Sequence, residues 1–170
     1  MTSHHCVRAV TLSAALFASI LAAAPAGAAT HRTYALGPLR VVHPWIPPTP
    51  NAAPTAAGYL TITNTGKLAD RLVEISSPAA AEVEPHHMSM AHGIMSMRPI
   101  MGGAAIGPGQ SLTFAPGGDH LMLIGLKRPL TAGQHVPASL HFEHAGRLNI
   151  EFVVEPRPAA TASMPGMDMH

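Results

Sequence analysis

The sequence predicts an all-β domain, a two-sheet sandwich or barrel of short antiparallel strands, and three observations lead to this prediction. Short runs of aliphatic and β-branched residues are separated by Gly, Pro, Asn and Asp. In residues 59–63 and 148–152 apolar and polar side chains alternate, as they do in a sheet with one buried face. No segment has a convincing helical period. Two such sheets would enclose one core.

The expected strands follow one another between turn-forming residues. They cover residues 39–43, 58–63, 71–75, 82–90, 93–99, 111–114, 120–126, 137–142 and 148–154. Residues 44–54 are rich in proline, which cannot donate to a strand ladder, so this segment is expected to be an irregular loop over one end of the sandwich. Aromatic residues make up only 4% of the chain, and the core is therefore expected to consist of Val, Leu, Ile and Ala.

The first residues have the pattern of a secretory signal peptide. Arg8 precedes an apolar stretch, residues 10–24, and small residues at 26–29 offer an A-x-A-like cleavage site. We expect a signal peptide over residues 1–28, cut after residue 28 or 29, and a periplasmic mature chain that is not inserted in the membrane. The only cysteine, Cys6, falls within this segment, so the exported protein would carry no thiol.

The remaining chain is long enough for one domain, expected over residues 32–155. A flexible tail is expected over residues 156–170, because this segment is rich in Pro, Ala and Ser and has no apolar periodicity, although its end is rich in Met and His. The formal net charge of +1 provides no basic face for nucleic acid. We therefore expect a monomer that does not bind nucleic acid.

Methionine and histidine are concentrated in two stretches of this domain. The first reads HHMSM at residues 86–90 and MSM at 95–97, and the second reads HLM at 120–122. Thioethers and imidazoles are soft or borderline ligands. A set of them without cysteine suits copper, above all Cu(I), better than Zn(II), Mg(II) or Ca(II). The sequence therefore predicts a copper site.

The spacing of the first stretch indicates which side chains share a face. A tight turn over residues 90–93 would place Met88 opposite Met95 and His86 opposite Met97, close enough to share one metal ion. A shift of two residues would leave His86 and Met97 diagonal on the same face. A shift of one residue would send the side chains of one strand to the other face.

The second stretch places a histidine and a methionine on the same side of one strand. His120 and Met122 are two residues apart on an expected strand, so their side chains point to the same side of the sheet, with Leu121 and Leu123 pointing inward. Two histidines and two methionines could then converge. Such a ligand set is neutral and soft, and it becomes roughly tetrahedral when closed around Cu(I).

A simpler interpretation competes for each residue taken alone. A methionine on a half-buried strand is usually core filler, and we interpret Met90 and Met95 in this way and Met101 as a loop residue. Four histidines without a donor partner at metal spacing are expected at the surface or the edge of the core: His43, His135, His141 and His144. The joint pattern of the two stretches nevertheless favours a metal site.

Three passages carry a resemblance to a known family: HPWIPPTPNAAPTAAGYLTITNTG, VEPHHMSMAHGIMSMRPI and PGGDHLMLIGLKRPL. They resemble the PCu(A)C-type periplasmic copper chaperones, and the likeness covers residues 39–154. The family signature is a histidine, a methionine eleven positions on, and His-x-Met after about twenty-one further residues. The resemblance implies a cupredoxin-like Greek-key β-sandwich. It assigns the copper ligands, called here the predicted ligand set, to His86, Met97, His120 and Met122.

The resemblance also implies a function and a partner. The protein would supply Cu(I) to the Cu(A) centre of cytochrome c oxidase, alone or with a Sco-type thiol protein. Two departures from the family are visible. Twenty-two residues separate Met97 from His120, and the extra residue falls in a glycine-rich loop at 101–110 that can absorb it. Ile46-Pro47 stands where the family often has a small residue and an arginine.

Accessory donors lie outside the predicted ligand set. His87, Met88 and His92 are its neighbours, with His87 facing away from His86 in a regular strand, and Met88 is an accessory candidate. The tail offers a second, loose copper site from Met164, Met167, Met169 and His170. Cleavage after residue 28 would place His31 third from a free amine, an arrangement that can hold Cu(II) in a square-planar nitrogen set.

Three other functions are compatible with parts of the pattern. A copper buffer or resistance protein would use the same ligands without an oxidase acceptor. An electron-transfer cupredoxin would need a cysteine thiolate, which the mature chain lacks. A copper enzyme would need a catalytic triad, acid-base pair or cofactor loop, and no such spacing is found. We therefore expect a copper chaperone that is not an enzyme.

Overall fold

The computed structural model describes residues 32–91 and 94–157, in which all regular secondary structure is β-strand. The predicted signal peptide at residues 1–28 and most of the predicted tail at 156–170 lie outside these residues. The strands are β1 (Thr33–Leu36), β2 (Leu39–Ile46), β3 (Thr55–Asn64), β4 (Asp70–Ser76), β5 (Glu82–Ala91), β6 (Ile94–Pro99), β7 (Ala104–Ile106), β8 (Ser111–Phe114), β9 (His120–Ile124), β10 (His135–Phe142) and β11 (Gly146–Val154). Among the described residues no helix is long and apolar enough to cross a membrane.

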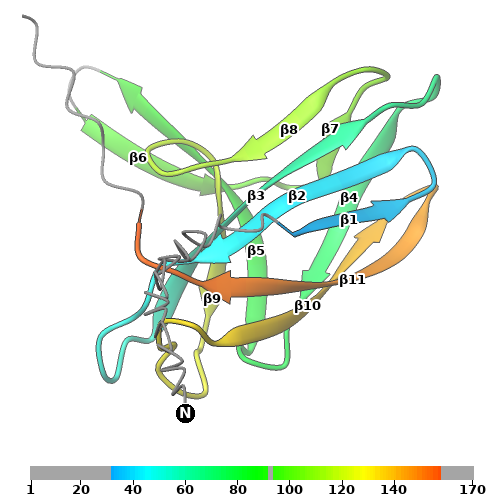
Figure 1. Ribbon diagram of the computed structural model, residues 1–170. Coiled ribbons are helices and arrows are strands. Elements are labelled where there is room, and N and C mark those ends of the chain that lie inside the picture. Colours follow the sequence, from blue (N-terminus) through cyan, green and yellow to red (C-terminus); the bar gives the residue numbers. More distant parts are fainter. Residues whose placement is uncertain (1–31, 92–93, 158–170) are drawn as a thin grey trace, which may run out of the picture. The chain divides into compact units, whose positions relative to one another are not determined.

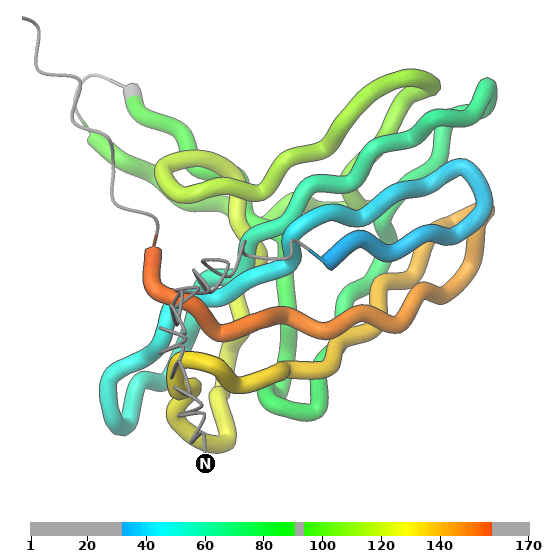
Figure 2. Tube along the Cα trace, in the orientation of Figure 1, coloured from blue at the N-terminus to red at the C-terminus, as the bar shows by residue number. Residues whose placement is uncertain are grey.

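Seven of the strands form a closed circuit. Around it they follow the order β2, β11, β10, β4, β5, β9 and β3, and β3 pairs again with β2. Neighbouring strands are antiparallel, except that β2 and β11 run parallel. The other strands attach to this circuit: β1 to β2, β8 to β3, β7 to β4 and β6 to β5. The all-β sandwich or barrel predicted from the sequence is confirmed (Figure 1 and Figure 2).

The circuit encloses one apolar core. Its largest fully buried side chains are Phe114, Phe142, Phe152, Leu39, Ile46, Leu60, Ile62, Leu72, Ile106, Leu121, Leu123 and Leu130. Full burial of a side chain of this size contributes about 1.5–3 kcal/mol to folding. Aliphatic residues dominate as expected, and phenylalanines fill the remaining volume. None of the described residues between 84 and 103 belongs to this core, and Figure 1 shows β6 and the end of β5 extending past the barrel.

The strand β2 is longer than the sequence predicts. Residues 44–46 were expected in the loop, but they belong to β2, and the loop begins after them. The ladder with β3 passes directly from Val42 to Trp45, so that Pro44, which has no N–H, lies in a bulge and leaves no ladder donor unpaired. His43 in the same bulge has φ 50°. The prolines thus displace the strand locally without ending it.

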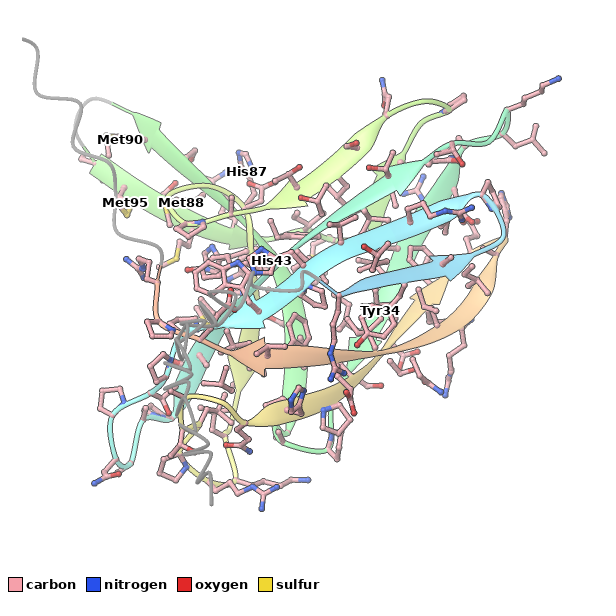
Figure 3. The ribbon with its side chains drawn as sticks, viewed as in Figure 1. Tyr34, His43, His87, Met88, Met90 and Met95 are labelled. Carbon is pink, nitrogen blue, oxygen red and sulfur yellow. The ribbon has the colours of Figure 1, made fainter. Side chains whose placement is uncertain are left out.

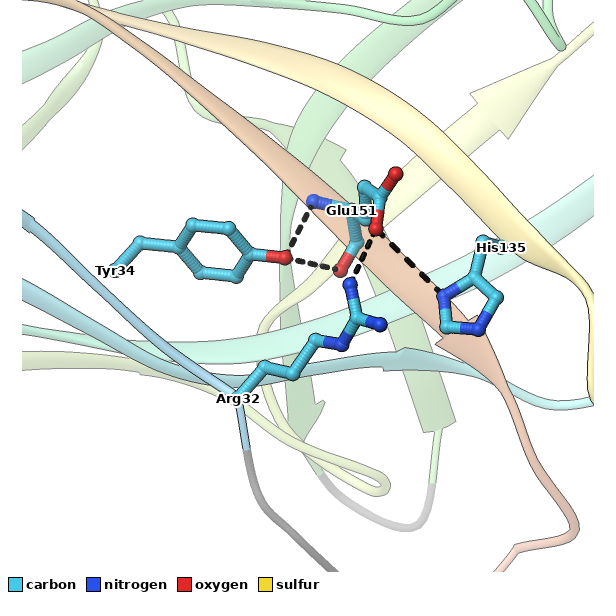
Figure 4. Close-up of polar contacts among 4 residues, drawn as sticks. All are labelled: Arg32, Tyr34, His135 and Glu151. Atoms are coloured by element: carbon cyan, nitrogen blue, oxygen red, sulfur yellow. Dashed lines mark hydrogen bonds and ion pairs between the residues drawn. The ribbon is translucent and has the colours of Figure 1, made fainter.

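The short edge strand β1, which the sequence did not predict, is held by a polar cluster on β11 (Figure 4). The backbone N–H of Glu151 donates to the Tyr34 hydroxyl oxygen at 3.0 Å. The carboxylate of Glu151 pairs with the guanidinium of Arg32 and lies 3.7 Å from Nδ1 of His135. These contacts join the first described residues to the barrel. The strand β7 was also missed, because its three residues, AAI, are too short to show a period.

A buried carboxylate joins β4 to the hairpin between β10 and β11. Asp70 is 8% exposed, and its two carboxylate oxygens accept backbone N–H groups of Arg71, His144 and Ala145 at 2.7–3.0 Å. Burial alone would raise the pKa of Asp70, but the three backbone hydrogen bonds outweigh burial, and the pKa is lowered from its ordinary value. Asp70 therefore remains charged in the folded protein at neutral pH.

Candidate metal centre

Two histidines of the predicted ligand set face each other across β5 and β9. The antiparallel register places His86 directly opposite His120. Their ring centroids are 5.9 Å apart, and the ring planes are inclined by 54°. His120 is 4% exposed, while the His86 side chain is 15% exposed. These rings therefore lie side by side on the sheet, shielded from most of the solvent.

The four members of the predicted ligand set share one face of the sheet. Met122 pairs with Glu84, two residues before His86 on the same strand, and Met97 pairs with Met88, two residues after it. Directly paired residues, and residues two apart on a strand, point to the same side. Leu121 and Leu123, on the alternate positions of β9, are fully buried, as predicted. The ligand face is thus the outer face of the barrel wall.

The four members of the predicted ligand set differ in exposure, and the most exposed lies on the hairpin of β5 and β6. His120 is buried, His86 and Met122 are half-buried, and Met97 is 52% exposed. The two histidines are in ring contact, whereas Met97 lies diagonally from His86, one step toward the end of the hairpin. The structure therefore places nitrogen donors on the inner side of the candidate site and an accessible sulfur on its outer side.

Hydrogen bonds leave one free nitrogen on each imidazole. Nε2 of His86 lies 2.9 Å from the Glu84 carboxylate, which can only accept, while Nδ1 of His86 is buried and has no hydrogen-bond partner among the described residues. Nδ1 of His120 donates to the carbonyl oxygen of Gly118 at 3.2 Å, which leaves Nε2 as the unprotonated nitrogen of a neutral ring. A carboxylate or carbonyl that fixes the second nitrogen is typical of metal-binding histidines.

The register of the hairpin differs by two residues from the one we predicted. The prediction placed His86 opposite Met97 and Met88 opposite Met95, whereas Met88 pairs with Met97 and His86 pairs with Pro99. The strands continue to pair up to Ala91 and Ile94, so the connection lies farther along the chain than the expected turn at 90–93. Because the shift is even, His86 and Met97 still share a face.

The neighbouring candidates separate into two groups. His87 pairs with Arg98 on the other face, away from His86 as predicted, and its Nδ1 lies 2.6 Å from the Asp119 carboxylate. Met88 lies on the ligand face beside Met97. Met90 and Met95 were interpreted as core filler, and this is wrong: they are 70% and 56% exposed (Figure 3), because the hairpin leaves the barrel and nothing in the core covers that face.

The histidines predicted to lie outside the site do so. His43 contacts the Glu155 carboxylate and stacks on Trp45, with ring centroids 6.1 Å apart. His135 and His141 lie 3.7 Å from Glu151 and Glu74. His141 is half-buried, and His144, the fourth residue of this group, is exposed. Within residues 32–91 and 94–157, His, Cys, Asp and Glu form no group of three or more that could hold a metal.

Several predicted donors lie outside the described residues. They are His31, His92, Met164, Met167, Met169 and His170. Sequence reasoning also missed two residues that act on the candidate ligands, Glu84 and Gly118. Glu84 had a detectable signal, because it stands two residues before His86 and therefore on the same face of the strand. The carbonyl of Gly118 had none, since its direction depends on the turn before β9. Met101 is 84% exposed in a turn, as predicted.

Comparisons with known proteins identify the family and the fold of the chain. The family model described as "Putative lipoprotein LpqE-like" matches residues 39–154. The chain is 34% identical over 138 residues to "Putative lipoprotein Lxx21020" of Leifsonia xyli subsp. xyli, and the alignment covers 80% of this chain and 81% of that protein. The residues matched by the family model include both stretches of candidate ligands.

Two solved structures share the fold. The copper-bound PCuAC domain from PmoF2 aligns with a TM-score of 0.64 at 26% identity and covers 74% of this chain and 99% of that domain. The solution structure of CuI-DR1885 from Deinococcus radiodurans aligns with a TM-score of 0.52 at 30% identity and covers 68% of this chain and 76% of that protein. The predicted cupredoxin-like fold of PCuAC type is thereby confirmed.

Proposed function

The chain belongs to the LpqE-like family, and from this premise we propose that it is an exported copper chaperone that holds Cu(I) with the predicted ligand set. Copper is its cargo, taken up and released by exchange of ligands. No bond of an organic substrate is made or broken, so the protein is not an enzyme. Two similar structures, the copper-bound PCuAC domain from PmoF2 and CuI-DR1885, support the choice of metal.

The observation that carries the proposal is the neighbouring pair of His86 and His120 rings, each with one nitrogen that no hydrogen bond from the described residues engages. Nδ1 of His86 is buried without a hydrogen-bond partner, and the His86 and His120 rings are 5.9 Å apart. A buried polar atom without a partner costs about 1–3 kcal/mol. A metal ion bound to that nitrogen would remove this cost, and the adjacent ring would supply a second nitrogen to the same ion.

Methionine on the same face favours Cu(I) over other ions. Met97 and Met122 add neutral thioethers, which select Cu(I) and bind Zn(II), Mg(II) and Ca(II) poorly. Thioethers are also suited to export, because they cannot be consumed as disulfides in an oxidising compartment. Export itself is part of the proposal. It rests on the apolar stretch at residues 10–24 and on a relative named as a lipoprotein, and mass spectrometry of the secreted protein tests it by the position of its first residue.

The exposed side of the site suits transfer to another protein. Met97 is 52% exposed, so an incoming thiolate or imidazole can reach the metal there and displace a neutral ligand first. We assign the Cu(A) centre of cytochrome c oxidase as acceptor, reached directly or with a Sco-type thiol protein. A periplasmic copper buffer is the alternative, and it would bind Cu(I) in the same way without passing it to a Cu(A) domain.

A competition titration tests the ligands. The full chain is titrated with Cu(I) against a chelator, beside Met97→Leu plus Met122→Leu and a variant truncated after Val154. Leucine keeps volume and apolarity but removes the donor. We expect the double variant to lose affinity by about a hundredfold or more and the truncated variant to keep the tightest site. The reverse pattern would place the main site in the tail and refute the proposal.

A transfer assay separates the chaperone from the buffer. The Cu(I)-loaded protein is mixed with an apo Cu(A) domain, and the metal content of each partner is measured after separation. A chaperone transfers the metal to the Cu(A) domain. Retention of copper at an acceptor excess would assign the buffer function and leave the ligand assignment intact.

A further inference from the structure

The hairpin of β5 and β6 carries two facing pairs of methionines, and three of these four residues lie outside the predicted ligand set. Met88 pairs with Met97, and Met90 pairs with Met95. All four point to the ligand face, because their positions alternate with Ser89 and the paired residues of β6 follow the same alternation. Directly paired Cβ atoms are about 5 Å apart, so the sulfur atoms of one pair can reach a common ion.

These methionines are not explained by packing. Met90 is 70% exposed and Met95 is 56% exposed, and none of the described residues between 84 and 103 belongs to the buried core. Figure 3 shows Met88, Met90 and Met95 grouped on the hairpin, where it extends past the barrel. A group of exposed apolar side chains on one face is more often part of a binding site than other parts of a protein surface are.

The opposite face of the hairpin has a different chemistry. Its pairs are His87 with Arg98, Ser89 with Ser96 and Ala91 with Ile94. The two serine hydroxyl oxygens are 3.0 Å apart, and Ile94 is 72% exposed. The methionines of the hairpin therefore all lie on the ligand face, whereas the opposite face carries polar and charged groups and one exposed isoleucine. A face that needed only solubility would carry polar groups in the positions of Met90 and Met95.

We propose that Met90 and Met95 form a second Cu(I) site, built from thioethers alone, at the exposed part of the hairpin. Met88, two residues from Met90 on the same face, can supply a third sulfur. The site would take up Cu(I) from solution or from a donor and pass it through the Met88–Met97 pair to the histidines. The ion stays monovalent and the thioethers stay neutral, so the step needs neither an electron nor a proton. The site itself is independent of the proposed function; only the onward transfer rests on it.

Cu(I) titration of the full chain, followed by NMR of the methionine ε-methyl groups, tests this site. The signals of Met90 and Met95 are assigned by single leucine substitutions. We expect the first equivalent of Cu(I) to move signals of the predicted ligand set and a later, weaker equivalent to move those of Met90 and Met95. The variant Met90→Leu plus Met95→Leu should bind one Cu(I) fewer and keep the tighter site.

Controls make the outcomes distinct. Met101→Leu removes a still more exposed thioether from a loop and should leave the number of bound Cu(I) ions unchanged. Unmoved Met90 and Met95 signals, or an unchanged stoichiometry in the double variant, would overturn the second site. If His86→Ala leaves the tighter site intact while Met90 and Met95 still respond, the proposed function is wrong and the hairpin site stands. Onward transfer is tested by stopped-flow measurement of the rate at which Cu(I) loads the histidine site. We expect this rate to be several-fold lower in the double variant, and an unchanged rate would reject onward transfer.

Discussion

At the scale of single residues, the candidate site depends on how two imidazoles are oriented. His86 is held through Nε2 by Glu84, and His120 is held through Nδ1 by the carbonyl of Gly118, so opposite ring nitrogens are left for a ligand. Each partner selects one tautomer of a neutral ring, which is the form that binds metal. The ligand nitrogens are therefore prepared by residues that would not touch the ion.

Removal of Glu84 is expected to weaken Cu(I) binding without removing a ligand. In Glu84→Ala the His86 ring loses the acceptor that keeps the proton on Nε2, and we expect Cu(I) affinity to fall about tenfold in a chelator competition. Glu82→Ala is the matched control, because Glu82 is an exposed carboxylate two residues earlier on the same face. Equal losses in the two variants would indicate a general effect of charge and contradict the orienting role of Glu84.

At the scale of elements, the turn between β6 and β7, which follows the hairpin of β5 and β6, needs two residues with positive φ. Gly102 and Gly103 have φ of 75° and 84°, in the left-handed region that favours glycine. A Cβ added at Gly102 would meet no atom within 4 Å, whereas at Gly103 it would lie 2.7 Å from the backbone oxygen of Leu72. The two positions therefore share a conformational cost and differ in a steric one.

Alanine substitution at these two glycines separates the costs. Gly102→Ala is expected to lower the free energy of unfolding by about 1–2 kcal/mol, the cost of a left-handed conformation for a residue with a Cβ. Gly103→Ala is expected to cost clearly more, because β4 must move away from the turn as well. Urea denaturation of both variants measures the difference. Equal losses would show that the contact with Leu72 relaxes freely and would contradict the tight packing of this turn.

The connection between β4 and the β10–β11 hairpin depends on the charge of Asp70. Its pKa is lowered in the folded protein because the backbone hydrogen bonds outweigh burial, whereas the unfolded pKa is about 3.9. The stabilisation is therefore complete above the unfolded pKa and is lost as the pH falls through the folded pKa.

Substitution of Asp70 tests this pH dependence. Asp70→Asn is expected to lower the free energy of unfolding by about 1.5–3 kcal/mol at pH 7, since hydrogen bonds to a charged group are replaced by bonds to a neutral one. Denaturant titrations of both proteins over a pH series should show the difference shrinking as the pH falls below the unfolded pKa. The exposed Glu82→Gln serves as control. A difference that stays constant down to the acid limit would refute the role of the charge.

At the scale of the whole molecule, the fold divides the ligand face into two environments. The closed circuit of strands holds His86 and His120 in its wall, beside the core residues Leu121 and Leu123. The β5–β6 hairpin carries the methionines away from the barrel into solvent (Figure 1). A shielded pair of imidazoles and exposed thioethers therefore lie on one face of the same sheet.

Much of this arrangement could be predicted because strand alternation is local. The period of two placed Leu121 and Leu123 inward and put His120 and Met122 on a common face. The same period explains why Met97 stays on the predicted face although the register differs by two residues. A shift by an even number of residues leaves every side chain on the same face of the sheet. The identity of the candidate ligands therefore tolerated an error in the predicted turn.

The rest depends on contacts that no local pattern contains. The sequence of β5 and β6 does not reveal that the hairpin leaves the barrel, so Met90 and Met95 could not be distinguished from core residues. The bulge that keeps Pro44 within β2 depends on pairing with β3, which is distant along the chain. The direction of the Gly118 carbonyl is likewise a result of folding. In each case the missing information is tertiary.

X-ray absorption at the copper edge tests the central claim most directly. The full chain is loaded with one equivalent of Cu(I), and the spectrum is compared with that of Met97→Leu plus Met122→Leu loaded in the same way. The account predicts nitrogen and sulfur neighbours of Cu(I) in the unsubstituted protein and loss of the sulfur contribution in the variant. A first equivalent without sulfur neighbours, or a sulfur contribution that survives both substitutions, would contradict it.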